Sequence, residues 1–128
     1  MGEVEERLAR LSQPKGDLMM LVGQTVRSQT VIRFAATKTD PSGARWAPWK
    51  RNYPKSGSIL VRSNNLARSI QADNTDNMAR VFTNVFYGAY HQFGTKKMSA
   101  RAFIGLEEGK DTEQVRMVVE NYISELLA

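Results

Sequence analysis

The C-terminal segment of the chain carries the hydrophobic pattern that most restricts its fold. Apolar residues recur there at the spacing of one helix face: Val115, Val118, Val119, Tyr122, Ile123, Leu126 and Leu127. Asp111, with Gln114 three residues later, has the form of a capping box. The pattern predicts a helix from Asp111 to Leu127, about 25 Å long at the usual rise per residue. Its opposite face is charged, so one side of the helix is expected to be buried and the other solvated. That charged face consists of Glu113, Arg116, Glu120 and Glu125.

Two further helices are predicted at the N-terminus. The first, over Glu3–Leu11, has three apolar residues at helical spacing behind a run of glutamates: Val4, Leu8 and Leu11. Pro14 and Gly16 then break the pattern, because proline cannot continue a helix and glycine favours a turn. A second helix is predicted over Asp17–Phe34, with Asp17 available as its cap. We expect the pair to form a helical hairpin with one shared apolar seam.

The middle of the chain predicts a long irregular loop followed by a small antiparallel hairpin. Periodicity is lost from Thr37 to Ser58, and Asp40-Pro41-Ser42-Gly43 within it is a strong turn signal. Residues 66–70 fit one helical turn, with Ser63 or Asn64 as its cap. Residues 69–72 and 79–83 flank a run of aspartate and asparagine, Asp73–Asn77, that is typical of a hairpin tip.

A short helix is predicted over Val85–Phe93. Its apolar positions form one face, and Gly94 after it suits a left-handed C-cap. Gly88 and Ala89 place small residues between Tyr87 and Tyr90, which permits close approach of another element. The order helix, helix, loop, hairpin, helix, helix predicts an α+β fold. We expect a single domain over residues 1–128, because that length fits one core and no linker divides the chain.

Composition excludes several classes of protein. The chain has no cysteine, which excludes a disulfide framework, a thiolate zinc site and a cysteine nucleophile. Its apolar runs fall far short of the roughly 20 residues that a membrane span needs. The acidic start, residues 1–6, is not a secretory signal. The sequence therefore predicts a cytoplasmic protein that does not contact a membrane.

The net charge of +5 is concentrated in two places. One basic cluster lies in the middle of the chain and a second follows residue 95: Lys38, Arg45, Lys50, Arg51, Lys55, Arg62 and Arg68, then Lys96, Lys97 and Arg101. Such a cluster can attract phosphate. A solvated loop, or a face that meets an acidic partner, is the more frequent reason for such a charge run, and we favour it.

Catalytic and cofactor sites are not indicated. His91 is the only histidine, and no cysteine or carboxylate cluster accompanies it at metal-ligand spacing. No nucleophile elbow supports a serine triad. Gly105 and Gly109 lack the strand and the Lys-Ser/Thr of a phosphate loop. We expect no enzyme activity, no cofactor, no metal and no small-molecule substrate.

Two tryptophans mark the long loop. Trp46 and Trp49, followed by Lys50 and Arg51, can stack on nucleic-acid bases beside phosphate contacts. Their spacing equally suits a loop folded back on the core, or an anchor against another subunit. We favour packing or an interface, and expect Trp49→Ala to weaken self-association more than folding. Candidate interface residues are Trp46, Trp49, Lys50, Arg51, Lys96, Lys97, Arg101 and Phe103.

Several blocks of the sequence resemble the phage virion morphogenesis family, the Mu G-like group related to tail completion proteins. The family pattern Tyr-Ala-x-x-His-Gln-Phe-Gly is approximated by residues 84–94, and its Pro-Ala-Arg-Pro-Phe-Leu/Ile-Gly block by residues 98–105. Upstream, Arg33-Phe34 with residues 40–48, and residues 60–70, are also similar. The matching motif residues are Tyr87, Ala89, His91, Gln92, Phe93, Gly94, Ala100, Arg101 and Phe103. The similarity covers nearly the whole chain in order.

Two departures from the family pattern are apparent. Asn64 stands where the family has glycine, a mild change because asparagine tolerates a left-handed backbone. Ser99 and Ala102 replace the two prolines, so we expect a looser 95–103 loop than in other members, as in a divergent or prophage copy.

The resemblance implies a structural role late in virion assembly, at the head-proximal end of the tail or the head–tail junction. It implies a homo-oligomer, such as a ring, with tail tube, terminator or head–tail connector proteins as partners. Genomic DNA in a channel is a further contact that it allows, and the virion and the bacterial cytoplasm are the expected locations. Two competing hypotheses are a non-specific nucleic-acid-binding module that uses the basic centre, and a small enzyme.

Overall fold

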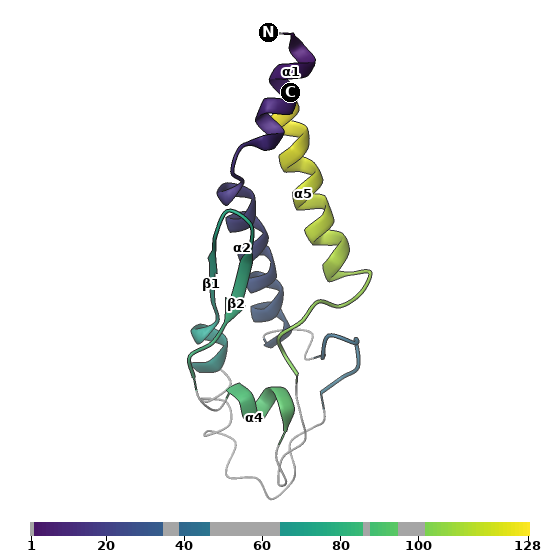
Figure 1. The fold of residues 1–128 in the computed structure, drawn as a ribbon. Coiled ribbons are helices and arrows are strands. Elements are labelled where there is room, and N and C mark those ends of the chain that lie inside the picture. Colours follow the sequence, from purple (N-terminus) through teal and green to yellow (C-terminus); the bar gives the residue numbers. More distant parts are fainter. Residues whose placement is uncertain (1, 35–38, 47–64, 86–87, 95–101) are drawn as a thin grey trace, which may run out of the picture.

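Helix α2 (Gly16–Ile32) is the central element of the computed structural model, which describes residues 2–34, 39–46, 65–85, 88–94 and 102–128. The β-hairpin lies along one side of α2, and helix α5 (Asp111–Leu127) packs on another (Figure 1). The molecule is elongated. Helix α1 (Glu3–Ser12) and the C-terminus lie at one end, and helix α4 (Gly88–Phe93) lies toward the other. The predicted α+β fold is confirmed.

The hairpin consists of β1 (Gln71–Asn74) and β2 (Ala79–Phe82), paired antiparallel with Ala72 opposite Val81. Its tip closes where the Thr75 amide donates to the Met78 carbonyl at 2.8 Å. Small residues bring the hairpin close to α2, because a Cβ at Gly23 would lie 3.6 Å from the Cβ atoms of both Ala72 and Ala79. The predicted hairpin is confirmed, although β1 extends further into the Asp/Asn run than expected, to Asn74.

Helix α5 has the bounds that its apolar periodicity predicts, and its start differs from the prediction. Lys110, not Asp111, precedes the first turn, and no side chain caps it. The capping box does not form, because Asp111 and Gln114 bond to α2 and to the preceding loop instead. Its seven apolar positions are half-buried, so α1 and α2 cover that face only in part.

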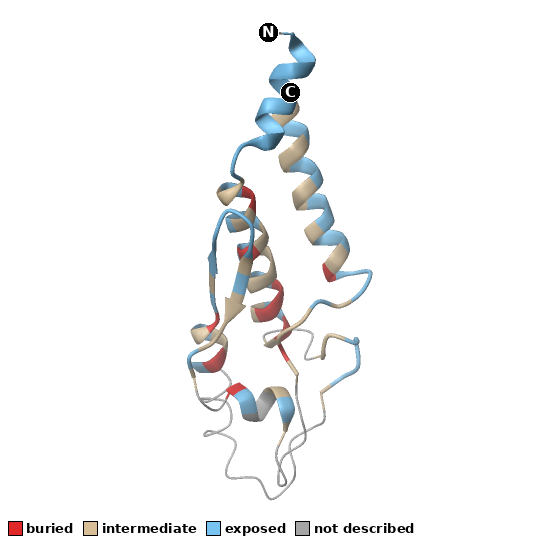
Figure 2. Ribbon diagram, viewed as in Figure 1, coloured by how far each residue is buried: buried red, intermediate tan, exposed pale blue. Residues whose placement is uncertain are grey.

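Both N-terminal helices are present, but α1 does not fold back along α2 as a hairpin. It extends beyond the start of α2 and lies beside the end of α5 (Figure 1). Pro14 and Lys15 connect the two helices, and α2 begins at Gly16 with Asp17 in its first turn rather than as its cap. There the carboxylate faces the positive end of the helix dipole. No residue of α1 is buried (Figure 2).

The most enclosed core lies near α4. Leu66, Ile70 and Phe103 are buried together, and Leu66 lies in the predicted helical turn, observed over residues 65–69. Half-buried hydrophobic side chains surround them: Val31, Phe34, Trp46, Val81, Val85 and Ile104. Figure 2 shows buried residues along α2 and near α4, and none on α1. None of the helices in the described ranges combines the length and apolar character of a membrane span.

Candidate functional site

Trp46 is anchored within the chain. Its indole Nε1 donates to the Ala102 carbonyl at 2.9 Å, and its ring meets Phe34 edge-on with centroids 5.2 Å apart. A buried indole usually finds such a partner for its N–H. Of the roles that the sequence left open for Trp46, the structure shows the loop folded back on the core.

Phe103 belongs to the core of this chain. It is 1% exposed, and its ring lies 5.2 Å from that of Phe34. In the described conformation Phe103 packs inside the chain, and its part in an interface stays a prediction. The sequence of the short apolar run 103–106 does not indicate which of its side chains is buried in the core.

Gln92 joins the two blocks that carry the family resemblance. Its side-chain Oε1 accepts hydrogen bonds from the backbone amides of Phe103 and Ile104 at 3.0 and 3.1 Å. Its Nε2 donates to the Ile104 carbonyl at 3.2 Å. One amide side chain therefore satisfies three backbone groups of the neighbouring segment. The His-Gln element of the motif has, through Gln92, a structural role as a bracket between α4 and residues 103–104.

Close packing around α4 depends on Gly88. A Cβ at this position would lie 2.9 Å from Thr83 Cγ2 and 3.4 Å from Leu66 Cδ1. The predicted close approach at this small residue is therefore present. Gly94 after the helix has φ +77°, the left-handed conformation predicted for its C-cap.

Phe93 differs from its prediction as part of a buried helix face. Its side chain is 80% exposed, and Ala89, one turn earlier, is also exposed. Because α4 starts at Gly88, Val85 lies before the helix, and the inward face consists of Gly88 and Gln92 instead. The outward face of α4 therefore presents an aromatic ring to solvent.

A buried ion pair, which the sequence analysis did not identify, joins α2 to α5. Arg33 Nη2 lies 2.8 Å from Asp111 Oδ2, with the side chains 4% and 9% exposed. Nη1 donates to the carbonyls of Phe103 and Gly105, and the Glu107 amide donates to Asp111 Oδ2 at 2.9 Å. Arg33 was singled out only as part of a resembling block. In the sequence, the only sign of this ion pair is that Arg33 stands next to apolar residues in a helix that is otherwise expected to be buried on one side.

Gln29 extends this network. Its Nε2 donates to the Asp111 carbonyl at 3.0 Å and to Gln114 Oε1 at 2.9 Å, while its own Oε1 is buried without a partner. A small cavity of about 70 Å³ lies beside these side chains, between the end of α2 and the start of α5. Its polar groups at Gln29, Arg33 and Asp111 serve the contact between the helices.

The predicted turn at Asp40 is confirmed. Its Oδ1 accepts hydrogen bonds from the Ser42 hydroxyl and amide and from the Ala44 amide, at 2.5, 2.9 and 3.1 Å. The Ser42 hydroxyl is the largest cause of a lowered pKa for the Asp40 carboxyl, and the two amides also lower it. Gly43 in this turn has φ +88°. These bonds hold the base of the loop that Trp46 anchors.

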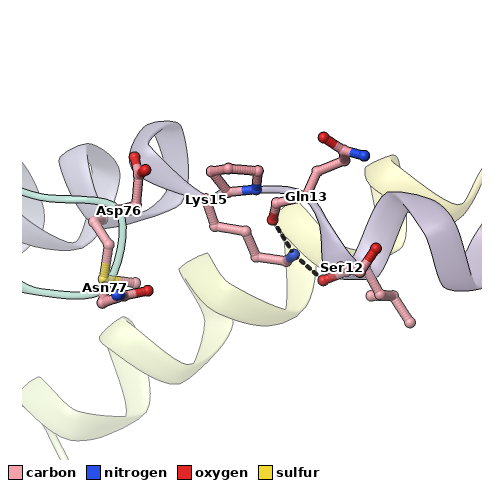
Figure 3. A pocket seen from close by; sticks show the side chains of 8 residues that line it. Ser12, Gln13, Lys15, Asp76 and Asn77 are labelled. Atoms are coloured by element: carbon pink, nitrogen blue, oxygen red, sulfur yellow. Dashed lines mark hydrogen bonds between the residues drawn. The ribbon is translucent and has the colours of Figure 1, made fainter.

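A large open pocket lies where α1 meets α2. Its volume is about 610 Å³, and Figure 3 shows the α1–α2 connection on one side and the hairpin tip on the other. Lys15 turns back on the connection, where its Nζ donates to the carbonyls of Leu11 and Gln13. The lining is Leu11, Ser12, Gln13, Pro14, Lys15, Met19, Asp76 and Asn77. Within the described ranges, no group of three or more potential metal ligands is found.

Several candidate residues lie outside the described residues: Trp49, Lys50, Arg51, Tyr87, Lys96, Lys97, Ala100 and Arg101, together with the side chain of His91. Their part in an interface stays a prediction. Among the arginines that the structure describes, Arg7 and Arg116 pair with carboxylates of their own helices, and Arg80 pairs with Asp73 of the neighbouring strand.

Comparisons with known proteins agree over the length of the chain. The model of the phage virion morphogenesis family matches residues 1–124. The chain is 30% identical to Mu-like prophage FluMu G protein 1 of Haemophilus influenzae, over 96% of this chain and 90% of that protein. It is 36% identical to Mu-like prophage FluMu G protein 2 of the same organism, over 71% of this chain and 61% of that protein. No solved structure matches significantly.

Proposed function

This chain belongs to the phage virion morphogenesis family and has a role in phage virion assembly, and from that premise we propose that it acts in tail completion or head–tail joining. In this proposal it works as one domain over residues 1–128 and as a subunit of a homo-oligomeric ring at the head-proximal end of the tail. Its partners are tail tube, terminator or connector proteins. It is made in the bacterial cytoplasm, remains in the virion and has no catalytic activity.

Exposed apolar surface is the observation that supports assembly. Among the described residues, four hydrophobic side chains are buried, whereas ten large ones are exposed. The exposed group lies on α1, α2, the hairpin tip, the end of α4, the loop before α5 and α5 itself: Val4, Leu8, Leu11, Met20, Leu21, Ile32, Met78, Phe93, Leu106 and Met117. Monomeric proteins rarely leave large contiguous apolar patches in water. A subunit that is completed by its neighbours accounts for this distribution.

Three of the described arginines, all outside the two basic clusters of the sequence, have partners within the chain. Arg33 is buried in an ion pair, and Arg80 and Arg116 bond to neighbouring carboxylates, so these cations are not available for phosphate. Non-specific DNA binders need several free cations along one surface. Contact with DNA in a channel remains a subsidiary part of the proposal.

Light scattering behind size exclusion tests self-assembly, over a concentration series at low and high salt. We expect a discrete oligomer whose mass is an integral number of subunits and which persists at high salt, because apolar contacts are not screened. A chain that stays monomeric, and also fails to bind isolated tails, would contradict the proposal. Steeply salt-dependent affinity for duplex DNA by a monomer would favour the nucleic-acid-binding alternative instead.

A further inference from the structure

The apolar stripe of α1 is uncovered along its whole length. Val4, Leu8 and Leu11 lie on one face of the helix at 68%, 59% and 37% exposure, and α1 has no buried residue. A helix of ten residues is marginal in water when it stands alone, and packing of its apolar face normally stabilises it. The stripe therefore needs a cover that the folded chain does not supply.

The contact between α1 and α5 leaves the stripe free. Arg10 Nη1 donates to the carbonyls of Leu126 and Ala128 at 3.2 and 3.3 Å, at the end of α5. These bonds are polar and exposed, and they fix where α1 lies without covering its stripe. Helix α1 is thus fixed at one end of the molecule while its apolar stripe stays exposed.

The opposite end of the molecule carries a complementary surface (Figure 1). Phe93 and Ala89 form the outward face of α4, and this ring has the largest exposed fraction among the described large hydrophobics. Arg68, in the helical turn of residues 65–69, is exposed at the same end and has no partner among the described residues. An apolar ring, at the same end as a cation that is unpaired among the described residues, complements an apolar stripe with an acid at its edge.

The charges of α1 distinguish between its possible covers. Glu3 pairs with Arg7, whereas Glu5 and Glu6 are exposed and have no partner in the described part of the chain. Parallel pairing of α1 with α1 of another copy would bring glutamates together, which is unfavourable. Antiparallel pairing would bring them near Arg7 and Arg10, which already bond to Glu3 and to the end of α5. The outer stripe of α2, Met20 to Ile32, offers apolar side chains but no exposed cation along it. The basic end of a second copy suits both the stripe and the acid at its edge.

We propose that α1 of one subunit packs its Val4–Leu8–Leu11 stripe on the Phe93 face of a second copy of this chain, with Glu5, at the edge of the stripe, toward Arg68. This inference rests on the proposed role in assembly and specifies its interface. Because the two surfaces lie at opposite ends of one molecule, the contact is heterologous. Repeated from copy to copy, it either closes into a ring or forms an open chain.

Crosslinking tests the contact directly, because the chain contains no cysteine. Ser12→Cys places a thiol at the end of α1, and Ala89→Cys places one beside Phe93, and neither change removes a proposed apolar contact. A short bismaleimide should join the two variants when they are mixed, and join neither variant to itself. Met117→Cys, an exposed position on α5, is the matched control and should not be joined to Ser12→Cys. A Ser12–Ser12 product, or no mixed product in an oligomeric sample, overturns the inference.

Charge reversal provides an independent test. Glu5→Arg and Arg68→Glu should each weaken association about threefold to tenfold, and combining them in one chain should restore it. Glu108→Arg, at an exposed position in the turn before α5, controls for net charge and should leave association unchanged. If the protein is oligomeric but the combined variant shows no recovery, this interface is wrong and the assembly role stands. A monomer that also gives no crosslink on isolated tails contradicts both.

Discussion

Removal of Arg33 is expected to destabilise the fold far more than removal of any exposed arginine. The Arg33–Asp111 pair joins the end of α2 to the start of α5, and its side chains are 4% and 9% exposed. Arg33→Met keeps the aliphatic stem but leaves the Asp111 carboxylate buried without its cation. The carbonyls of Phe103 and Gly105 also lose a donor. Breaking one side of a buried pair typically costs about 3–5 kcal/mol.

That magnitude is a large share of the stability of a domain, which is typically about 5–15 kcal/mol. For a chain of this size it corresponds to a fall in Tm of roughly 10–20 °C. Urea unfolding, followed by far-UV circular dichroism, measures the change as a shift of the midpoint at constant slope. Arg116→Met is the matched control, because the Arg116–Glu113 pair is exposed to solvent, and its midpoint should hardly move.

The double variant Arg33→Met/Asp111→Leu separates charge burial from packing. Replacing a whole buried pair by apolar side chains is often neutral or stabilising, so the double variant should recover most of the loss. A midpoint for Arg33→Met as close to the wild type as that of Arg116→Met would refute this reasoning. A double variant no more stable than Arg33→Met would show that the bonds to the backbone carbonyls, not the unpaired carboxylate, determine the cost.

Three further predictions concern the surroundings of α4 and the 40–44 turn. Gln92→Ala leaves two partly buried amides without an acceptor and should cost about 1–3 kcal/mol in urea unfolding; an unchanged midpoint would contradict its role as a bracket. Gly88→Ala should cost about 1–3 kcal/mol through overpacking, and Thr83→Ser should restore part of it, because the serine lacks the methyl group that lies 2.9 Å from the added Cβ. The Ser42 hydroxyl lowers the pKa of Asp40, so the carboxylate stabilises the fold above the usual carboxyl pKa, and this contribution is lost as the pH falls through the lowered value. The advantage of the wild type over Asp40→Asn should therefore be present at neutral pH and vanish in acid; an advantage that does not depend on pH would contradict the assignment.

Elements with a strong local pattern could be predicted from the sequence. The bounds of α5 follow from seven apolar residues at helical spacing, and the hairpin follows from an Asp/Asn-rich tip between two short β-forming segments. The Asp40 turn and the left-handed Gly94 were predictable for the same reason, since backbone conformation at such positions depends on a few neighbouring residues.

Contacts between distant residues were not predictable in this way. Asp111 and Gln114 satisfy a local rule for a capping box, yet Arg33 and Gln29, about 80 residues earlier in the chain, bond to them instead. Leaving one partner of a buried ion pair unpaired costs about 3–5 kcal/mol, more than the roughly 0.5–2 kcal/mol of a helix cap, so the tertiary contact prevails. Gln92 was identified through a family resemblance, and its role as a bracket became apparent only from the backbone it faces.

The partner of α1 illustrates a more general restriction on reading function from such a sequence. An apolar stripe predicts that one side of a helix is covered, but the pattern is the same whether the cover belongs to the same chain or to a neighbour. The sequence analysis assigned the stripe to a hairpin with α2, whereas α1 lies at the end of α5 with its stripe exposed. Phe93 presents the same ambiguity at the other end of the molecule. In a subunit that acts by assembling, apolar side chains that are expected to be buried but are exposed in the single chain are therefore the first candidates for its interface.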